Sequence, residues 1–428
     1  MVSSFLEHRT TQAAQRRTMI VLMIAQIVGA IGVGVGPSLG VLLAGDVTHN
    51  EAFAGVARTA TTLGAAMFGL WLGTLAAQRG RRVALGLGWW LAAAGSALLV
   101  TAAQWNLIVP LFLGLLIIGA GSATVLQARF AATDLAEPHH KARSLALVVW
   151  VGTLGSVLGP NLGAPGEYMA STTGLTVFAA AFLIAAICLT LAGLIVVVFL
   201  RPDPLLLLER AAHVPVGGPA SGQPNRIRQA INELQVNGQA RVATVAILTA
   251  QAVMVGIMTM TPVHIIHQGG SITTVGITIS LHVAGMYALA PVVGLITDRL
   301  GYRFTISTGI GIFLLSLVIG AVRPDGMTWI MASLVLLGVG WSFVNVAGSA
   351  LFSVVVSPAT RAASQGGVDA LSNLCGATAA FIAGPLLVVT SFSFLSLLAI
   401  VALVPLAILM ATRPLLPDPA ALLGQASQ

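Results

Sequence analysis

The chain has 428 residues, of which 57% are hydrophobic and 8% are charged. A soluble domain carries charge on roughly a quarter of its residues, so this composition excludes an ordinary water-soluble fold. The net charge of +7 does not indicate nucleic acid binding, because the positions of the basic residues follow the rule for membrane proteins described below.

Twelve apolar segments follow one another along the chain, each close to the roughly twenty residues that a helix needs to span a bilayer. The 47 glycines fit this interpretation, because small residues allow membrane helices to pack closely. We therefore expect an all-α membrane protein with twelve transmembrane helices in two six-helix bundles. The expected helices are 19–43, 54–76, 83–102, 106–129, 145–166, 174–199, 242–264, 272–296, 304–322, 328–350, 363–388 and 391–411.

Basic residues are distributed asymmetrically about these helices. If residue 1 lies in the cytoplasm, 18 of the 20 Lys and Arg residues fall in or beside cytoplasmic segments, and only Arg58 and Arg323 lie on the other side. This pattern is the positive-inside rule, so we expect both termini in the cytoplasm. We expect a multi-pass protein of the inner (plasma) membrane, a monomer surrounded by lipid, with no nucleic acid partner.

The first expected helix, 19–43, is too long for the core of a secretory signal peptide and ends in no clear cleavage site, so we expect it to be retained. Its glycine-rich stretch, 29–40, lacks a following Lys-Ser/Thr pair, which argues against a phosphate-binding loop and an ATPase. No HExxH sequence or clustered Ser/His/Asp set occurs either. We expect neither enzymatic activity nor a resident cofactor.

A loop rich in Gly and Arg follows the second expected helix and is repeated after the eighth. The two copies contain Gly73, Gly80, Arg81 and Arg82, and Gly294, Asp298, Arg299, Gly301 and Arg303. These loops resemble the signature loop of the major facilitator superfamily, and with the six-plus-six arrangement the resemblance covers essentially the whole chain. It implies two bundles that rock about a central site, with loop residues that lock the cytoplasmic helix ends. Because Ala77 and Gln78 replace the acidic and first basic residues of the first copy, we expect the ion pairing to depend on the second copy.

The fifth expected helix carries a second motif, which contains Gly155, Gly159 and Pro160. It resembles a motif that is frequent in proton-coupled drug antiporters, which implies export. A kinked and tightly packed helix is the alternative interpretation. The arginine that this group carries in the fourth helix is Leu115 here, which favours the alternative. The Gly384–Pro385 pair in the eleventh helix repeats Gly159–Pro160, as expected of an internal repeat.

A polar segment, 200–241, separates the two sets of six helices. We expect it to be a cytoplasmic linker between an N-terminal bundle, 1–199, and a C-terminal bundle with a short tail, 242–428. Within the linker, 225–236 places Ile and Leu at helical spacing beside two arginines. This spacing indicates either a short amphipathic helix at the membrane surface or a solvated linker.

Helices seven and eight hold several Met and His residues in a span, 242–297, that has no Asp, Glu, Lys or Arg. Met254 and Met258 are four residues apart, and His282 and Met286 repeat this spacing, so each pair shares a helix face. Thioether and imidazole groups suit Cu(I). The MxxxM and HxxxM motifs resemble those of CcoA-like copper importers, which implies copper as cargo. Relatives of those importers also carry other cargo, such as riboflavin, and Met is an adaptable packing residue, so a structural role is the alternative.

Two further sets of polar residues lie in the second half. His264 and His267 are expected at the outer end of helix seven, where they collect metal, sense pH or are wetted at the interface. Asp369 is the only acidic residue well inside an apolar helix, and such carboxylates are functional candidates because charge in lipid is costly. Gln365, Asp369 and Asn373 form one stripe on helix eleven, for which proton coupling and a structural hydrogen-bond network are the alternatives.

Three functional hypotheses follow from these patterns. The first is copper uptake, with copper as cargo and Met254, Met258, His282 and Met286 as transient ligands, assisted by His264. The second is proton-coupled transport of a small organic molecule, either drug export or vitamin-like uptake, in which the Met and His side chains only shape the cavity. The third is a membrane scaffold or sensor that moves no solute.

Overall fold

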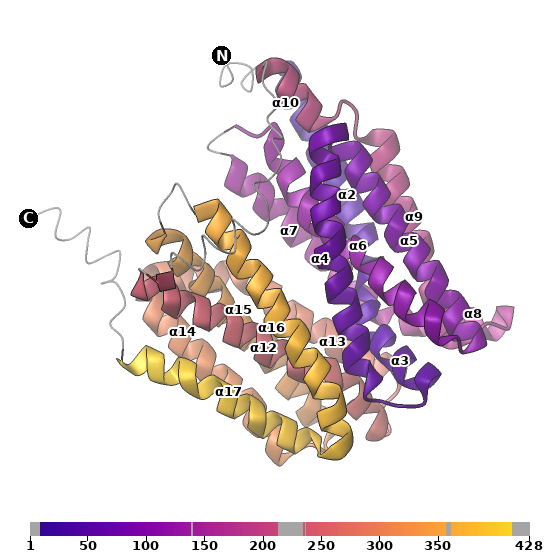
Figure 1. Ribbon diagram of the computed structural model, residues 1–428, viewed down its shortest axis with the longest axis vertical. Coiled ribbons are helices and arrows are strands. Elements are labelled where there is room, and N and C mark those ends of the chain that lie inside the picture. The colour runs from indigo at the N-terminus through magenta and orange to yellow at the C-terminus, as the bar shows by residue number, and fades with distance from the viewer. Residues whose placement is uncertain (1–8, 138–139, 213–233, 236, 357–360, 413–428) are drawn as a thin grey trace, which may run out of the picture. The chain divides into compact units, whose positions relative to one another are not determined.

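The computed structural model describes residues 9–137, 140–212, 234–235, 237–356 and 361–412. In these residues every regular element is a helix (Figure 1), so the expected all-α class is confirmed for this part of the chain. Most of the expected amphipathic segment, 225–236, lies outside the described residues. The chain forms two compact units. Unit 1 contains Met1–Asn50, Ala57–Ala220 and Val275–Ser280, and unit 2 contains Glu51–Val56, Ser221–Thr274 and Leu281–Gln428.

Unit 1 is built from long apolar helices that are interrupted at two prolines. Its elements are α2 (Arg9–Gly34), η1 (Gly36–Gly40), α3 (Val41–Thr48), most of α4 (Phe53–Arg79), α5 (Arg81–Trp105), α6 (Ile108–Asp134), α7 (Lys141–Leu158), η2 (Gly159–Leu162), α8 (Gly163–Thr173), α9 (Val177–Phe199) and α10 (Pro204–Ala212). Pro37 lies in the π-helical turn η1, and Pro160 lies in the 3-10 turn η2. Both interruptions follow from proline, which has no backbone N–H to continue an α-helix. Helix α5 packs on α6 and α9, and α2 packs on α7 and α9.

Unit 2 is organised around one buried helix, α12. Its elements are α12 (Gly238–His267), most of α13 (Ile272–Tyr287), α14 (Ala290–Val322), α15 (Met327–Val355), α16 (Arg361–Val389) and α17 (Phe392–Thr412). Helix α12 packs on α15, α16 and α17, and α14 packs on α15 and α17. One apolar cluster joins three of these helices through Ile247 of α12, Phe352 of α15 and Val368 of α16.

The described residues contain eleven helical segments that are long and apolar enough to cross a membrane. One of them, Ile272–Val322, has 51 residues and covers two of the twelve expected helices, 272–296 and 304–322. Within this segment, helix α14 is interrupted at Gly301, which has φ 82° and ψ 165°. These angles are close to those of Gly80, φ 88° and ψ 169°, which separates α4 from α5. Among the described residues, the number of observed segments therefore differs from the twelve expected only at this point.

Candidate functional site

Helices α12 and α13 carry the Met and His pairs that the sequence singled out. Met254 and Met258 are both buried on α12. His282 is fully buried on α13, and Met286 is buried one turn further on. The described residues contain no group of three or more His, Cys, Asp and Glu side chains that could hold a metal ion. A metal at this position would therefore depend on thioether sulfur with imidazole.

His282 anchors α13 to α15. Its Nδ1 lies 2.7 Å from the carbonyl oxygen of Leu334, and because a carbonyl only accepts, Nδ1–H is the donor. In a neutral ring, Nε2 then carries the lone pair. The close approach depends on Gly338, because a Cβ at this position would overlap the backbone oxygen of His282 and lie 3.1 Å from its Nδ1. This bond is a structural role, which is one of the two alternatives that the sequence leaves open for the Met and His pairs.

An amide and two aromatic rings form a second feature of unit 2, which the sequence did not reveal. Trp341 of α15 is 9% exposed, and its Nε1 donates to Gln251 Oε1 of α12 at 3.1 Å. Tyr287 of α13 meets the Trp341 ring edge-on, with centroids 5.7 Å apart and an interplanar angle of 69°. Gly376 of α16 allows close packing beside Gln251, because its Cβ would lie 3.3 Å from Gln251 Cγ. We call Gln251, Tyr287 and Trp341 the amide–aromatic cluster.

On α12 and α15, residues of the amide–aromatic cluster share helix faces with the Met pair and with the residues that contact His282. Gln251, Met254 and Met258 are spaced three and four residues apart on α12, which places them on one face. On α15, Leu334, Gly338 and Trp341 share a face in the same way. The sequence motifs contain only the sulfur and imidazole groups on these faces. The available signal was Gln251, a polar residue in an apolar helix three residues before Met254.

The polar stripe of α16 is not packed inside unit 2. Asp369 and Asn373 are exposed and Gln365 is half-buried. Asn373 Nδ2 donates to the backbone oxygen of Asp369 at 3.0 Å. The carboxylate of Asp369 therefore lies on a face of α16 that other helices of the unit leave accessible, which a proton-carrying group requires.

The two histidines at the end of α12 bind neighbouring loops. His264 Nε2 lies 2.7 Å from the carbonyl oxygen of Pro324, and its ring stacks on Phe392 with centroids 4.3 Å apart. His267 Nε2 is paired with the carboxylate of Glu51. His264 is six residues beyond Met258, about 9 Å along the helix. It therefore lies apart from the Met pair, and its observed contacts fasten the helix end.

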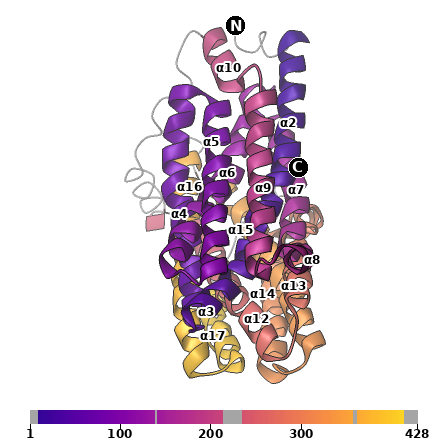
Figure 2. The same ribbon diagram turned by 90° about the vertical axis from the view of Figure 1, so that its right-hand side faces the viewer.

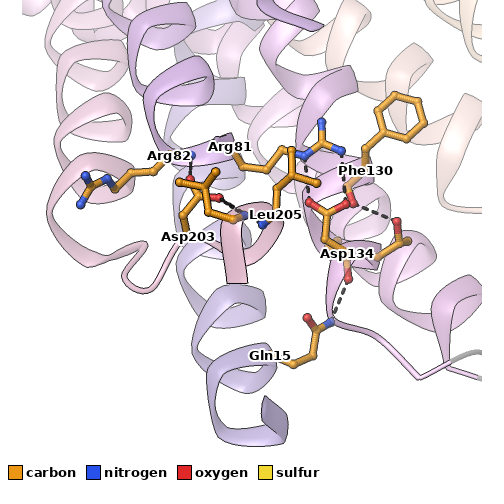
Figure 3. Close-up of polar contacts among 10 residues, drawn as sticks. Gln15, Arg81, Arg82, Phe130, Asp134, Asp203 and Leu205 are labelled. Carbon is orange, nitrogen blue, oxygen red and sulfur yellow. Dashed lines mark hydrogen bonds and ion pairs between the residues drawn. The ribbon is translucent and has the colours of Figure 1, made fainter. Parts of the chain in front are cut away.

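The first glycine–arginine loop forms a polar cluster in unit 1 (Figure 3). Arg81 pairs with Asp134 at the end of α6, with Nε to Oδ2 at 2.8 Å and Nη2 to Oδ1 at 3.2 Å. The carboxylate of Asp203 accepts from the backbone N–H of Arg82 at 2.8 Å and of Leu205 at 3.0 Å. Asp203 thus caps the N-termini of both α5 and α10. No pattern in the sequence indicates that Asp134 and Asp203 are partners of the loop.

This arrangement differs from the expectation that the second copy of the loop provides the ion pairs. Asp298, Arg299 and Arg303 are exposed, and they form no ion pair within the described part of the chain. The first copy of the loop has an ion pair because Arg81 reaches Asp134. A carboxylate of α6 thus takes the place of the acidic residue that is missing at Ala77.

The remaining motif glycines serve close packing. A Cβ on Gly155 of α7 would overlap the carbonyl oxygen of Ile27 in α2, and one on Gly159 would lie 2.6 Å from that of Ile31. A Cβ on Gly73 would lie 3.3 Å from Gln127 Nε2, whereas Gly294 has no neighbour within 4 Å. Tight packing of the fifth helix, one of the two interpretations of its motif, is thus observed.

Known proteins match the chain over most of its length. Residues 18–272 and 242–427 match the family model described as Major Facilitator Superfamily. The MFS-type transporter YdeG of Bacillus subtilis (strain 168) is 37% identical over 385 residues, which cover 90% of this chain and 88% of YdeG. The riboflavin transporter RfnT of Brucella anthropi is 29% identical over 415 residues, which cover 95% of this chain and 98% of RfnT. The crystal structure of the nucleoside transporter NupG has a similar fold, with a TM-score of 0.70, 16% identity, and coverage of 93% of this chain and 98% of NupG.

Proposed function

The chain belongs to the Major Facilitator Superfamily and is a membrane transporter, not an enzyme, and from this premise we propose that its cargo is a small aromatic organic molecule bound at the amide–aromatic cluster. Transport proceeds by alternating access and uses an ion gradient, with Asp369 as the proton carrier. The observation that carries the proposal is the hydrogen bond between Trp341 and Gln251 beside the ring of Tyr287.

The geometry of the cluster suits a planar ligand with hydrogen-bond acceptors. The indole N–H of Trp341 can only donate, so it fixes Gln251 Oε1 toward itself and turns Gln251 Nε2 away. Within the described residues Nε2 makes no hydrogen bond, so it is available to a carbonyl or ring nitrogen of the cargo. The rings of Tyr287 and Trp341 meet edge to face at 69° and offer a face and an edge for aromatic packing.

The similarity to RfnT supports this class of cargo, because riboflavin has a planar three-ring system with carbonyl oxygens. The absence of Asp, Glu, Lys and Arg from 242–297 agrees with a cargo that is recognised through stacking and hydrogen bonds instead of charge. Riboflavin is therefore the first probe, as a member of the proposed class.

The test is uptake of radiolabelled riboflavin into proteoliposomes that contain the wild type, Trp341→Phe or Gln251→Leu. We expect saturable uptake by the wild type, and a loss of about tenfold or more in each variant. Gln251→Leu removes the amide that bonds a polar ligand, and Trp341→Phe removes the N–H that orients this amide. Trp89→Phe is the matched control, since Trp89 is a buried indole of unit 1. Equal uptake by all four proteins would reject the cluster as the binding site. If riboflavin is not transported, a panel of aromatic heterocycles is tested, and no binding of any member would reject the class.

Copper uptake is a second candidate, favoured by the burial of Met254 and Met258 on one face of α12 and of His282 and Met286 on α13. Since His282 also holds Leu334, replacing it would disturb the fold as well as a metal site. The Met254→Leu, Met258→Leu double variant separates loss of a metal site from loss of the fold, because Leu has a similar volume and lacks sulfur. Saturable uptake of radioactive copper by the wild type and its loss in this variant would support copper. Uptake of the organic probe with no copper uptake would exclude it.

A further inference from the structure

The arginine-rich end of α2 lies beside the last turns of α9 (Figure 2). A groove lies between these two helix ends. It has a volume of about 760 Å³, and its lining includes Arg16, Arg17, Ile20, Ile24, Ile195 and Phe199. A smaller hollow of about 360 Å³ shares Ala13 and Arg17 with it and extends to Leu207 of α10. All of these residues belong to unit 1.

The groove changes from polar to apolar along its length. Arg16, Ile20 and Ile24 follow one another at four-residue spacing on α2, so they form one line about 12 Å long. Ile195 and Phe199 form a matching apolar line on α9. A phospholipid has the same order of groups, because a charged phosphate is joined to acyl chains over a comparable distance.

The basic end is suited to a phosphate. Arg16 and Arg17 are both exposed, and neither lining contains an acidic residue. Arg17 Nε donates to the carbonyl oxygen of Phe199 at 3.1 Å, which holds its guanidinium at the mouth of the groove. Within the described residues, the Nη groups of Arg17 make no hydrogen bond. Glu137 is close by, but it accepts from Gln12 Nε2 at 2.9 Å and lies 3.6 Å from His140.

We propose that this groove binds one anionic phospholipid, with the phosphate on Arg16 and Arg17 and an acyl chain along Ile20, Ile24, Ile195 and Phe199. Guanidinium groups bind phosphate through paired hydrogen bonds, which a zwitterionic headgroup weakens by its own positive charge. The surrounding lipid is as apolar as the groove, so burial adds no hydrophobic driving force. Packing contacts therefore hold the acyl chain. Charge distribution predicts that this end faces the cytoplasmic leaflet, where anionic lipids attract basic residues. The proposal does not depend on the identity of the cargo.

Native mass spectrometry of the detergent-purified protein tests this site with phosphatidylglycerol and phosphatidylcholine. We expect the wild type to retain one phosphatidylglycerol about tenfold more tightly than phosphatidylcholine, given two arginines at the headgroup. The Arg16→Gln, Arg17→Gln variant should lose this preference. Ala13→Trp should lose it too, because Ala13 lines both hollows and the indole would occupy this space while both charges remain. The Lys141→Gln, Arg143→Gln variant removes the same charge from exposed positions outside the groove and should keep the preference.

Three results would overturn the proposal. The first is equal retention of the two lipids by the wild type. The second is a loss of preference in the Lys141→Gln, Arg143→Gln control as large as in the groove variant, since bulk charge would then explain it. The third is full displacement of phosphatidylglycerol by millimolar inorganic phosphate, which would identify a free-anion site without an acyl seat. Thermal unfolding of each variant without added lipid separates loss of the site from loss of the fold.

Discussion

Gly80 combines a backbone conformation that L side chains rarely adopt with a crowded environment. Its φ is 88°, and a Cβ would overlap the carboxylate of Asp203. Gly80→Ala should therefore lower stability by about 2 kcal/mol or more through backbone strain and through loss of the Asp203 cap. Gly174→Ala is the matched control, because Gly174 has φ 75° and no neighbour within 4 Å. The thermal midpoints of the purified proteins measure the difference, and an equal fall in both would show that the contact with Asp203 contributes nothing.

Asp369 is the residue whose proposed role is easiest to separate from folding, because its side chain is exposed on α16. Asp369→Asn keeps the shape and removes the titratable proton. We expect uptake driven by a proton gradient to fall about tenfold or more, while exchange of labelled for unlabelled cargo without a gradient continues. Asp46→Asn, another exposed carboxylate, should leave both activities unchanged. Full gradient-driven uptake by Asp369→Asn would contradict the role.

The sequence predicts the kind of residue at a site better than its partner. The polar stripe of Gln365, Asp369 and Asn373 follows from helical spacing alone. The pairing of Gln251 with Trp341 does not, because these residues are ninety positions apart and meet only when α12 packs on α15. The same holds for Arg81 and Asp134, where the expected weakness of the first loop was offset by a carboxylate on another helix.

At the scale of elements, glycine sets how closely α13 approaches α15. Gly338→Ala would place a methyl group against the His282 backbone, so we expect a loss of about 1–3 kcal/mol from overpacking. Gly311 of α14 has no neighbour within 4 Å, and Gly311→Ala should instead raise stability by up to about 1 kcal/mol through helix propensity. Opposite shifts in thermal midpoint would establish the distinction. An equal fall in the thermal midpoints of both variants would show that replacing a helix glycine lowers stability in general, whatever the contact with His282.

The helices themselves could be predicted because lipid is their solvent. A spanning segment must satisfy its backbone internally and be apolar over roughly twenty residues, which leaves a clear pattern in the sequence. Helix ends were predicted less well. The apolar pattern does not predict that α6 continues to Asp134 or that α12 begins at Gly238. The start of α12 depends on capping by Asn237, and helix ends also depend on contacts with other loops.

At the scale of the whole molecule, the charge distribution predicts which loops face the cytoplasm. Glu51 and His267 belong to two expected outer loops and contact each other, which agrees with alternating helix directions. In a variant whose two native cysteines are replaced by Ala, Glu51→Cys should react with a membrane-impermeant maleimide in intact cells. Arg210→Cys should react only after permeabilisation. The reverse pattern would show that the termini lie outside.

Unit 1 includes Val275–Ser280, a segment of the second half of the chain, so a single cut in the chain cannot separate the two units. Ser280 Oγ accepts from Asn161 Nδ2 at 2.6 Å, and a Cβ on Gly276 would lie 2.6 Å from the carbonyl oxygen of Pro160, so these first turns of α13 complete the packing around η2. Glu51–Val56 is likewise part of unit 2. A gene split after codon 220 would therefore encode two fragments that each lack a piece of their own core. Such fragments are expected to accumulate only when co-expressed, as an obligate complementing pair.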